Sequence, residues 1–154
     1  MTATQRVLAV EAAISIVPNA LVSALFVWLL FRSVDTVPLW GMQGVAFDLV
    51  PTTFMLTLMT TIGLTLVVRA RTRKGAVHAA DAGFPALPHN VVARALVLAL
   101  TATVMLVPVS VIVLHLLWAG NWSYDTIMIF KVGYGVAVGL VVTSIVVLAA
   151  MRDG

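Results

Sequence analysis

Long runs of apolar residues, separated by short polar connections, dominate the chain. Four runs stand out, over residues 7–31, about 49–68, about 91–118 and about 126–151. A helix that crosses a bilayer needs about 20 mostly apolar residues, and each run reaches that length. The pattern predicts an all-α membrane protein, an up-down bundle of four transmembrane helices in a single transmembrane domain that spans residues 1–154.

The composition agrees with a membrane protein. Hydrophobic residues make up 62% of the chain and charged residues only 10%, whereas soluble domains carry about 45–50% apolar and about 25% charged residues. The mean hydropathy is +1.11. Such a chain has too few polar side chains to cover an ordinary water-facing surface, so its expected partner is the lipid bilayer.

The basic residues gather on one side of the predicted bundle. The connection between the second and third runs, with the start of the third, holds a basic cluster: Arg69, Arg71, Arg73, Lys74 and Arg94. The connection between the first two runs holds only Arg32, which Asp35 offsets. Because Lys and Arg accumulate in cytoplasmic connections, the central connection and both termini are predicted to be cytoplasmic. This explains the net charge of +3 without a nucleic acid partner.

The tryptophans lie at the other ends of the runs. All four are found there: Trp28, Trp40, Trp118 and Trp122. Tryptophan is enriched where a bilayer meets water, so these side chains predict an aromatic belt at the outer surface. On the basic side, Asn90 is predicted to cap the third helix, because an asparagine side chain accepts hydrogen bonds from the first free amides of a helix.

The two halves of the chain share a pattern of prolines, tryptophans and polar residues. Positions match at an offset of 90 between the first and third runs and of 83 between the second and fourth: Val17-Pro18 with Val107-Pro108, Trp28 with Trp118, Asp48 with Lys131, Thr60-Thr61 with Thr143-Ser144, and Arg69 with Arg152. These matches predict two tandem two-helix repeats, over residues about 7–75 and about 90–154, related by a pseudo-two-fold axis along the membrane normal. The alternative is chance matching between apolar segments.

Asp48 and Lys131 are the first candidates for a functional site. A charged side chain at the centre of a membrane helix costs about 2.5–3.5 kcal/mol on insertion scales. The two residues occupy equivalent repeat positions near the outer boundary, where an acid and a base at one depth could pair or line a vestibule. Alternatively, Asp48 caps the second helix with Pro51 in its first turn, and Lys131 extends to the outer headgroups.

Glu11 lies near the cytoplasmic end of the first span and is a candidate proton carrier. Only about four residues, near 6 Å of helix, separate it from the interface. The alternative is a carboxylate that pairs with Arg94 or Arg152 on the cytoplasmic side.

Pro18 and Asn19 lie near the middle of the first span. Proline removes a backbone donor and kinks a helix, and Asn19 could bond the freed carbonyl or a neighbouring helix. Pro108, with Ser110, repeats the motif in the third span. Paired kinks at corresponding positions suggest a cavity at the membrane midplane; the alternative is packing.

His115, one turn inside Trp118, completes the candidate polar site. A single histidine is more often hydrogen-bonded packing than a ligand. His78 and His89 lie in the cytoplasmic connection, so no haem pair or metal triad can be assembled across the bundle. We therefore expect no metal and no cofactor.

Two further patterns concern helix packing and polarity. Gly135 and Gly139 have G-x-x-x-G spacing, which permits close approach of another helix. That helix belongs either to the same bundle or to a second protomer or partner membrane protein. The second run is rich in threonine, and a stripe of hydroxyls there can line a polar path or bond back to the helix carbonyls: Thr53, Thr57, Thr60 and, less closely, Thr61.

Two segments resemble a group of small bacterial membrane proteins with four spans. They are Phe47 to Gly75, from Phe-Asp-Leu-Val-Pro-Thr-Thr-Phe-Met through the basic run, and Phe130-Lys131-Val-Gly-Tyr-Gly through Thr143-Ser144. The group has proline where this chain has Ser144. The resemblance covers about a third of the chain and implies a multi-pass protein of the bacterial inner membrane, with no assigned activity.

Two functions fit these features. The first is a small transporter or channel-like protein, with its site between the level of Asp48 and Lys131 and the kinks at Pro18 and Pro108, and with Glu11 as a proton carrier. The second is an accessory subunit that stabilises or anchors a larger membrane complex through the Gly135 and Gly139 face and the basic connection. The chain lacks recognisable nucleophile, metal and nucleotide motifs, so we expect it not to be an enzyme.

Overall fold

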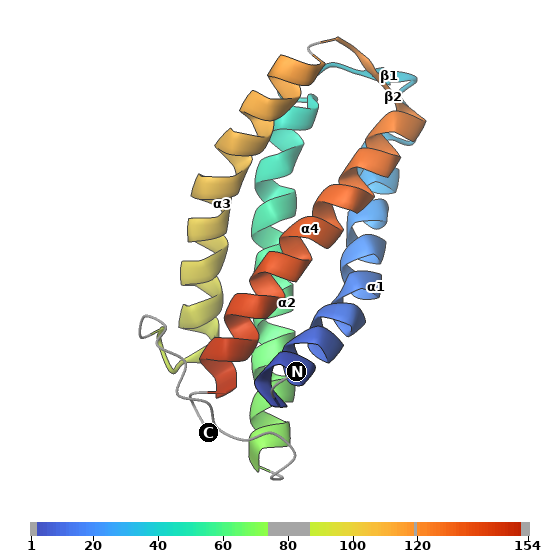
Figure 1. Ribbon diagram of the computed structural model, residues 1–154. Helices are drawn as coiled ribbons and strands as arrows, with labels where there is room; N and C mark the ends of the chain where they lie inside the picture. The colour runs from blue at the N-terminus through green and yellow to red at the C-terminus, as the bar shows by residue number, and fades with distance from the viewer. Residues whose placement is uncertain (1–2, 74–86, 119, 152–154) are drawn as a thin grey trace.

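The computed structural model describes residues 3–73, 87–118 and 120–151. Its main elements are four long helices: α1 (Ala3–Phe31), α2 (Val45–Arg73), α3 (Val91–Leu117) and α4 (Tyr124–Met151) (Figure 1). All four are long and apolar enough to cross a membrane. The prediction of an all-α bundle is confirmed, and the chain is a multi-pass membrane protein with four candidate spans.

Capping residues predicted from the sequence are correct for the start of α3 and wrong for the start of α2. Asn90 caps α3 as predicted, because its Oδ1 accepts from the amides of Val92 (2.9 Å) and Ala93 (3.2 Å). The prediction that Asp48 caps α2 is wrong. The helix begins at Val45, and the Asp48 amide already donates to the Gly44 carbonyl (3.2 Å) inside its first turn.

The preceding connection takes over the capping of α2. The amide of Val45 donates to the Pro38 carbonyl (3.1 Å) and that of Ala46 to the Leu39 carbonyl (3.0 Å). Free amides at a helix start need such partners, and here the folded-back backbone provides them. Asp48 is thereby left free to use its side chain elsewhere.

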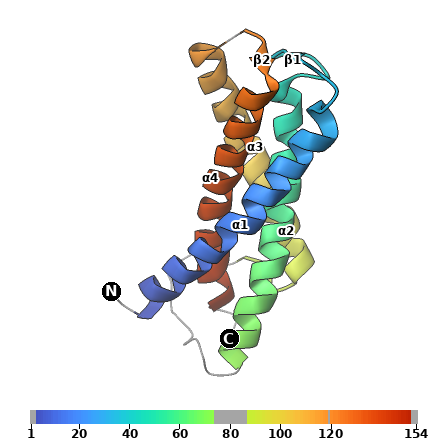
Figure 2. The same cartoon turned by 90° about the vertical axis from the view of Figure 1, so that its right-hand side faces the viewer.

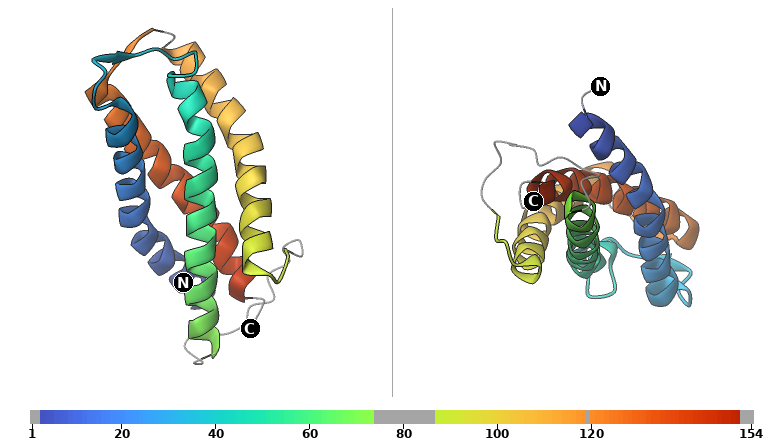
Figure 3. Two further views of the ribbon diagram at one scale, coloured as in Figure 1. Left: turned by 180° about the vertical axis from the view of Figure 1, so that it is seen from behind. Right: turned by 90° about the horizontal axis from the view of Figure 1, so that it is seen from below.

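The helices pack in a crossed order. α2 and α4 contact each other, α3 packs chiefly on α2, and α1 packs chiefly on α4 (Figure 3). Helices α1 and α2 follow one another in the chain but contact each other far less. Each outer helix therefore packs on the inner helix of the other hairpin, and α2 and α4 form the centre of the bundle.

A short antiparallel ribbon joins the connection between α1 and α2 to the connection between α3 and α4. β1 (Thr36–Val37) and β2 (Trp122–Ser123) pair with Thr36 opposite Ser123 and Val37 opposite Trp122. The ribbon lies at the end of the bundle far from the N-terminus (Figure 2). The sequence did not predict it, since two residues are too few to show a strand periodicity.

The apolar core is densest beneath this ribbon, where the helices and both connections meet. Its buried members are Val27, Phe31, Val37, Leu39, Val45, Leu49, Val107, Leu114, Trp122 and Ile127. Trp122 is buried, whereas Trp28, Trp40 and Trp118 are about half exposed. Three of the four tryptophans thus face the surroundings at one end, as an aromatic belt requires.

Gly135 and Gly139 of α4 face α1 within the same chain. A Cβ atom at Gly135 would lie 1.8 Å from Ser23 Oγ, and one at Gly139 would lie 2.0 Å from Asn19 Nδ2. Real Cβ atoms do not approach other atoms this closely, so only glycine allows the contact. The structure therefore assigns the G-x-x-x-G face to the bundle itself rather than to a second protomer.

Candidate functional site

Asp48 and Lys131 form an ion pair at the end of the α2–α4 interface nearest the β1–β2 ribbon. Lys131 Nζ donates to Asp48 Oδ2 and to Thr52 Oγ1 (2.6 Å). The Thr52 hydroxyl in turn donates to Asp48 Oδ1 (3.3 Å). Lys131 is fully buried and Asp48 is 5% exposed, so the expectation that Lys131 extends to the headgroups is wrong. The carboxylate one helix away gives its ammonium a closer partner.

Tyr134 continues this polar contact one turn further along α4. Its hydroxyl lies 2.7 Å from that of Thr53, which itself donates to the Leu49 carbonyl (2.7 Å). Because the Thr53 hydrogen is used in that bond, the Tyr134 hydroxyl is the donor between the two. Tyr134 was not among the predicted site residues, although its spacing of three residues from Lys131 places both on one helix face.

Three threonines extend the row along α2. Thr57, Thr61 and Thr65 follow Thr53 at successive intervals of four residues, and all three are fully buried. Within the described part of the chain their hydroxyl oxygens have no hydrogen-bond partner. By contrast, the hydroxyl of Thr103 bonds back to its own helix (2.7 Å). The hydroxyls of Ser23 and Thr143 are likewise buried without a partner among the described residues. The α2 row differs from them in its regular spacing of four residues.

Asn19 connects α1 to both central helices. Its Oδ1 accepts from the Thr60 hydroxyl (2.9 Å), and its side chain fills the space above Gly139. Asn19 is only 5% exposed. Of the two roles considered for it, the structure shows the hydrogen bond to a neighbouring helix. Thr60 is thereby turned toward α1 rather than into the row of Thr57 and Thr61.

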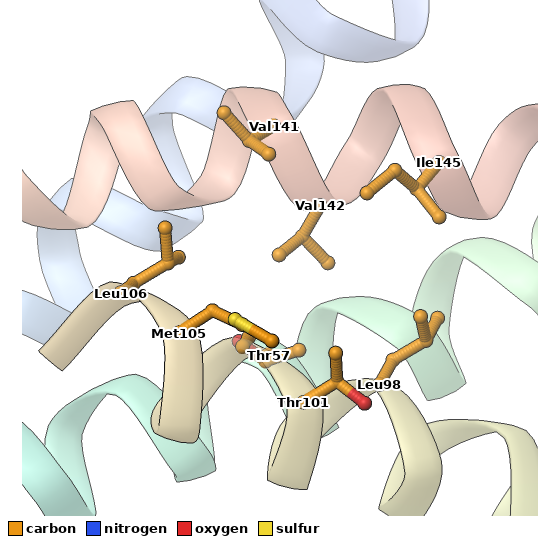
Figure 4. Close-up of a pocket in the computed structure, with 9 residues that line it drawn as sticks. Thr57, Leu98, Thr101, Met105, Leu106, Val141, Val142 and Ile145 are labelled. Carbon is orange, nitrogen blue, oxygen red and sulfur yellow. The ribbon is translucent and has the colours of Figure 1, made fainter.

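Hollows lie between the helices of each hairpin. One, of about 250 Å³, is lined by Pro18, Asn19 and Thr60 among others, between α1 and α2. The other, of about 180 Å³, lies between α3 and α4 over Thr57, with an almost wholly apolar lining (Figure 4). Pro108 does not line it. A hollow thus lies beside Pro18 of α1, whereas Pro108 of α3 does not contribute to the lining of the other hollow.

Glu11 forms an ion pair at the opposite end of the bundle, with Arg71 of α2. Glu11 is 2% exposed, whereas the Arg71 side chain is 43% exposed. The partners expected for Glu11 were others. Arg94 donates from Nε to the Pro88 carbonyl (3.1 Å), and Arg152 lies outside the described residues.

His115 is separate from these groups. It is exposed on α3, and its ring meets that of Trp40 edge-on, with centroids 5.7 Å apart. The structure therefore brings together Asp48 and Lys131, and places Asn19 and Glu11 of α1 against α2. It leaves His115 on the surface at the ribbon end of the bundle.

The grouped residues follow α2 from its first turn to its last. We call this set the polar column, and its members are Asp48, Lys131, Thr52, Thr53, Tyr134, Thr57, Asn19, Thr60, Thr61, Thr65, Glu11 and Arg71. It has a buried ion pair toward one end, a half-exposed pair at the other, and hydroxyl and amide groups between. Groups of this kind can hold water and pass protons. Comparisons with protein-family models, with curated proteins and with solved structures give no match for this chain.

Proposed function

We propose that the protein is a small transport protein in which protons move across the membrane along the polar column. The observation that carries the proposal is the row of buried, unpartnered hydroxyls at Thr57, Thr61 and Thr65. Valine has nearly the shape of threonine and would fill these positions without a desolvation cost. The hydroxyls therefore fit a role that packing does not require.

The chemistry of the row suits proton transfer. A hydroxyl donates one hydrogen bond and accepts two, so it can receive a proton on one side as it releases one on the other. Residues four apart on a helix are separated by about 6 Å along the axis, a gap that one water molecule can bridge. The ionisable pairs supply a proton-binding group at each end, with Glu11 as the carrier nearest the basic side.

The orientation that we propose follows from charge and aromatic residues. The basic cluster around Arg69, Arg71 and Arg73 lies at the end where α2 finishes, and the exposed tryptophans lie at the other. By the positive-inside rule, both termini then lie on the cytoplasmic side of a bacterial inner membrane. Asp48 and Lys131 face the outside in this arrangement, and Glu11 faces the cytoplasm.

An internal duplication is part of the proposal. In its support, the packing of α1 on α4 corresponds to that of α3 on α2 under a two-fold rotation. The paired β1 and β2 are related in the same way, and the ion pair joins the equivalent positions Asp48 and Lys131. Transporters built from two such halves commonly place their sites at the repeat interface, which here is the contact between α2 and α4.

The accessory role loses one of its two expected attachment surfaces, the glycine face. It needed an exposed small-residue face for a partner, and Gly135 and Gly139 lie beneath Asn19 and Ser23 of α1. We assign no catalytic activity to the chain, because the polar column contains no recognisable nucleophile set.

Proton flux into liposomes tests the proposal. The protein is reconstituted, a potassium diffusion potential drives protons inward, and an enclosed pH dye reports the rate. Thr61→Val should lower the flux about tenfold, equivalent to ~1.4 kcal/mol in a barrier, and leave thermal stability in detergent unchanged or higher. Thr103→Val makes the same change outside the polar column and should keep the full flux. Wild-type flux no faster than that of empty liposomes, or equal flux in Thr61→Val, would contradict the proposal.

A further inference from the structure

A cavity opens beside Asp48, on the side away from Lys131's helix. It has a volume of about 340 Å³ and lies between the end of α1, the connection that follows it and the first two turns of α2. Its walls are mostly apolar, with Phe31 and Phe47 among them, and Thr36 and Gln43 add polar groups. Among the described residues that line it, Asp48 alone is charged.

The charged side chains near the cavity do not offset this carboxylate, because they do not line the cavity. Arg32 lies over the ring of Trp28, with its Cζ 4.7 Å from the ring centroid, and does not line the cavity. Asp35 is exposed and likewise lies outside the lining. Among the described residues, the cation paired with Asp48 is Lys131, which reaches it from α4.

We propose that this cavity binds a small organic ammonium ion with an apolar body, and that its binding displaces a proton from Lys131. The inference rests on the proposed function and names the substrate class of its outer site. Ligand pockets range over about 300–1,000 Å³, so a cavity of this size suits a small molecule. Aromatic walls suit the apolar body, and the carboxylate suits the ammonium group.

Charge balance explains the displaced proton. Asp48 and Lys131 together are neutral, and a second cation would leave a net positive charge in a buried site, which is costly. Lysine, unlike arginine, can give up a proton when buried. Lys131 then passes from ammonium to neutral amine, the ligand's ammonium takes its place at Asp48, and one proton leaves through the polar column. Thr52 Oγ1, 2.6 Å from Lys131 Nζ, remains a hydrogen-bond partner for the amine.

The exchange is tested on the purified full-length chain in mild detergent. Phenethylammonium is the probe, and 2-phenylethanol is its neutral match in shape. Calorimetry measures binding, and an indicator dye in weakly buffered solution counts released protons. We expect about one proton released per bound cation and no release with the alcohol. Binding of the cation without proton release, or equal binding of the alcohol, would overturn the exchange.

Three variants locate the site. Lys131→Arg keeps the positive charge, and its guanidinium cannot lose its proton. Proton release should therefore be lost, and the dissociation constant for phenethylammonium should rise about tenfold or more. Val34→Trp narrows the cavity from its exposed wall, away from the ion pair, and should lower affinity to the same extent. Asp35→Asn removes a carboxylate of the same connection outside the lining and should bind normally. Unchanged binding in Val34→Trp would place the cation elsewhere and overturn the site.

The liposome assay separates this inference from the proposed function. Proton flux that depends on Thr61, in a chain that does not bind phenethylammonium, would overturn the cation site and leave the proton pathway standing. Binding with proton release, in a chain without flux, would support the cation site and overturn transmembrane proton movement.

Discussion

The two ion pairs of the bundle differ in their access to the surroundings. Asp48 and Lys131 are both buried between the central helices, and the Thr52 hydroxyl forms a hydrogen bond with each of them. Glu11 is equally buried, but its partner Arg71 is 43% exposed at the end of α2. Each pair joins two helices, yet only the second has a half-exposed member. Following the proposed orientation, we call Asp48–Lys131 the outer pair and Glu11–Arg71 the inner pair.

The difference teaches that burial, rather than the presence of a pair, decides its energetic weight. Breaking a fully buried pair costs about 3–5 kcal/mol, because the remaining charge is left without a partner. Where the charge left behind is on the exposed member, the cost approaches the about 0–1 kcal/mol of surface pairs, because water can solvate that member. The outer pair therefore fixes α2 against α4, whereas neutralising Glu11 in the inner pair would leave only the half-exposed Arg71 charged, at low cost.

Of the variants that test this difference, Asp48→Asn should have the largest effect on stability. The substitution leaves the Lys131 ammonium buried without a carboxylate, and we expect the free energy of unfolding to fall by about 3–5 kcal/mol. Thermal or denaturant unfolding in detergent measures the change. The double variant Asp48→Asn/Lys131→Met removes the stranded charge and should recover most of the loss.

Asp35→Asn is the matched control for this experiment, because Asp35 is an exposed carboxylate of the same outer end. It should change stability by less than about 0.5 kcal/mol. A similar small effect for Asp48→Asn would show that the outer pair is no more costly to break than a surface pair.

Gly139→Ala should weaken the contact between α4 and α1, which lies between the two ion pairs. Its Cβ would lie 2.0 Å from Asn19 Nδ2 and 2.6 Å from Asn19 Cγ, so the Asn19 side chain, or α1 with it, must move away from α4. We expect a loss of about 1–3 kcal/mol in unfolding free energy, as for other overpacked contacts. Because α1 carries Glu11, proteolysis or cross-linking should show loosening of the inner pair before the outer one.

The control for the glycine variant is on the same helix. Gly133 has no atom within 4 Å of a built Cβ, so Gly133→Ala should be neutral or raise stability by up to about 1 kcal/mol through helix propensity. Equal destabilisation by both variants would indicate that helix α4 tolerates no alanine there, and that close packing on Asn19 is not the cause.

Glu11→Gln should have the smallest effect on stability. The exposed Arg71 can turn to water once its partner is neutral, so we expect the unfolding free energy to fall by less than about 1 kcal/mol. The same variant should lower proton flux into liposomes if Glu11 carries protons. A stability loss as large as that of Asp48→Asn would show that the two pairs are equivalent after all.

Several features of the fold could be predicted from the sequence because they depend on neighbours along the chain or on the solvent. Four apolar runs of sufficient length gave the four helices, and Asn90 gave a helix cap. The equal depth of Asp48 and Lys131 also followed from their positions within their runs. Each of these needs only a count of residues and the cost of placing polar groups in hydrocarbon.

The choice of partners was beyond the sequence. Glu11 could meet any arginine at the basic end, and only the tilt and rotation of α1 bring it to Arg71. In the same way, Gly135 and Gly139 permit a close contact without naming the helix that makes it. Tyr134 was one aromatic residue among many in an apolar run until its hydroxyl was placed beside Thr53.

The sequence by itself determined that hydrocarbon is the solvent of this chain, where its spans lie, and which few residues carry the unavoidable polar groups. The tertiary structure alone decided that α2 and α4 form the centre, that the folded-back connection caps α2, and that the threonine row faces inward. The physical reason is that hydrophobicity and helix capping act over one or two turns. Helix rotation and pairing, in contrast, depend on side chains from segments far apart in the chain.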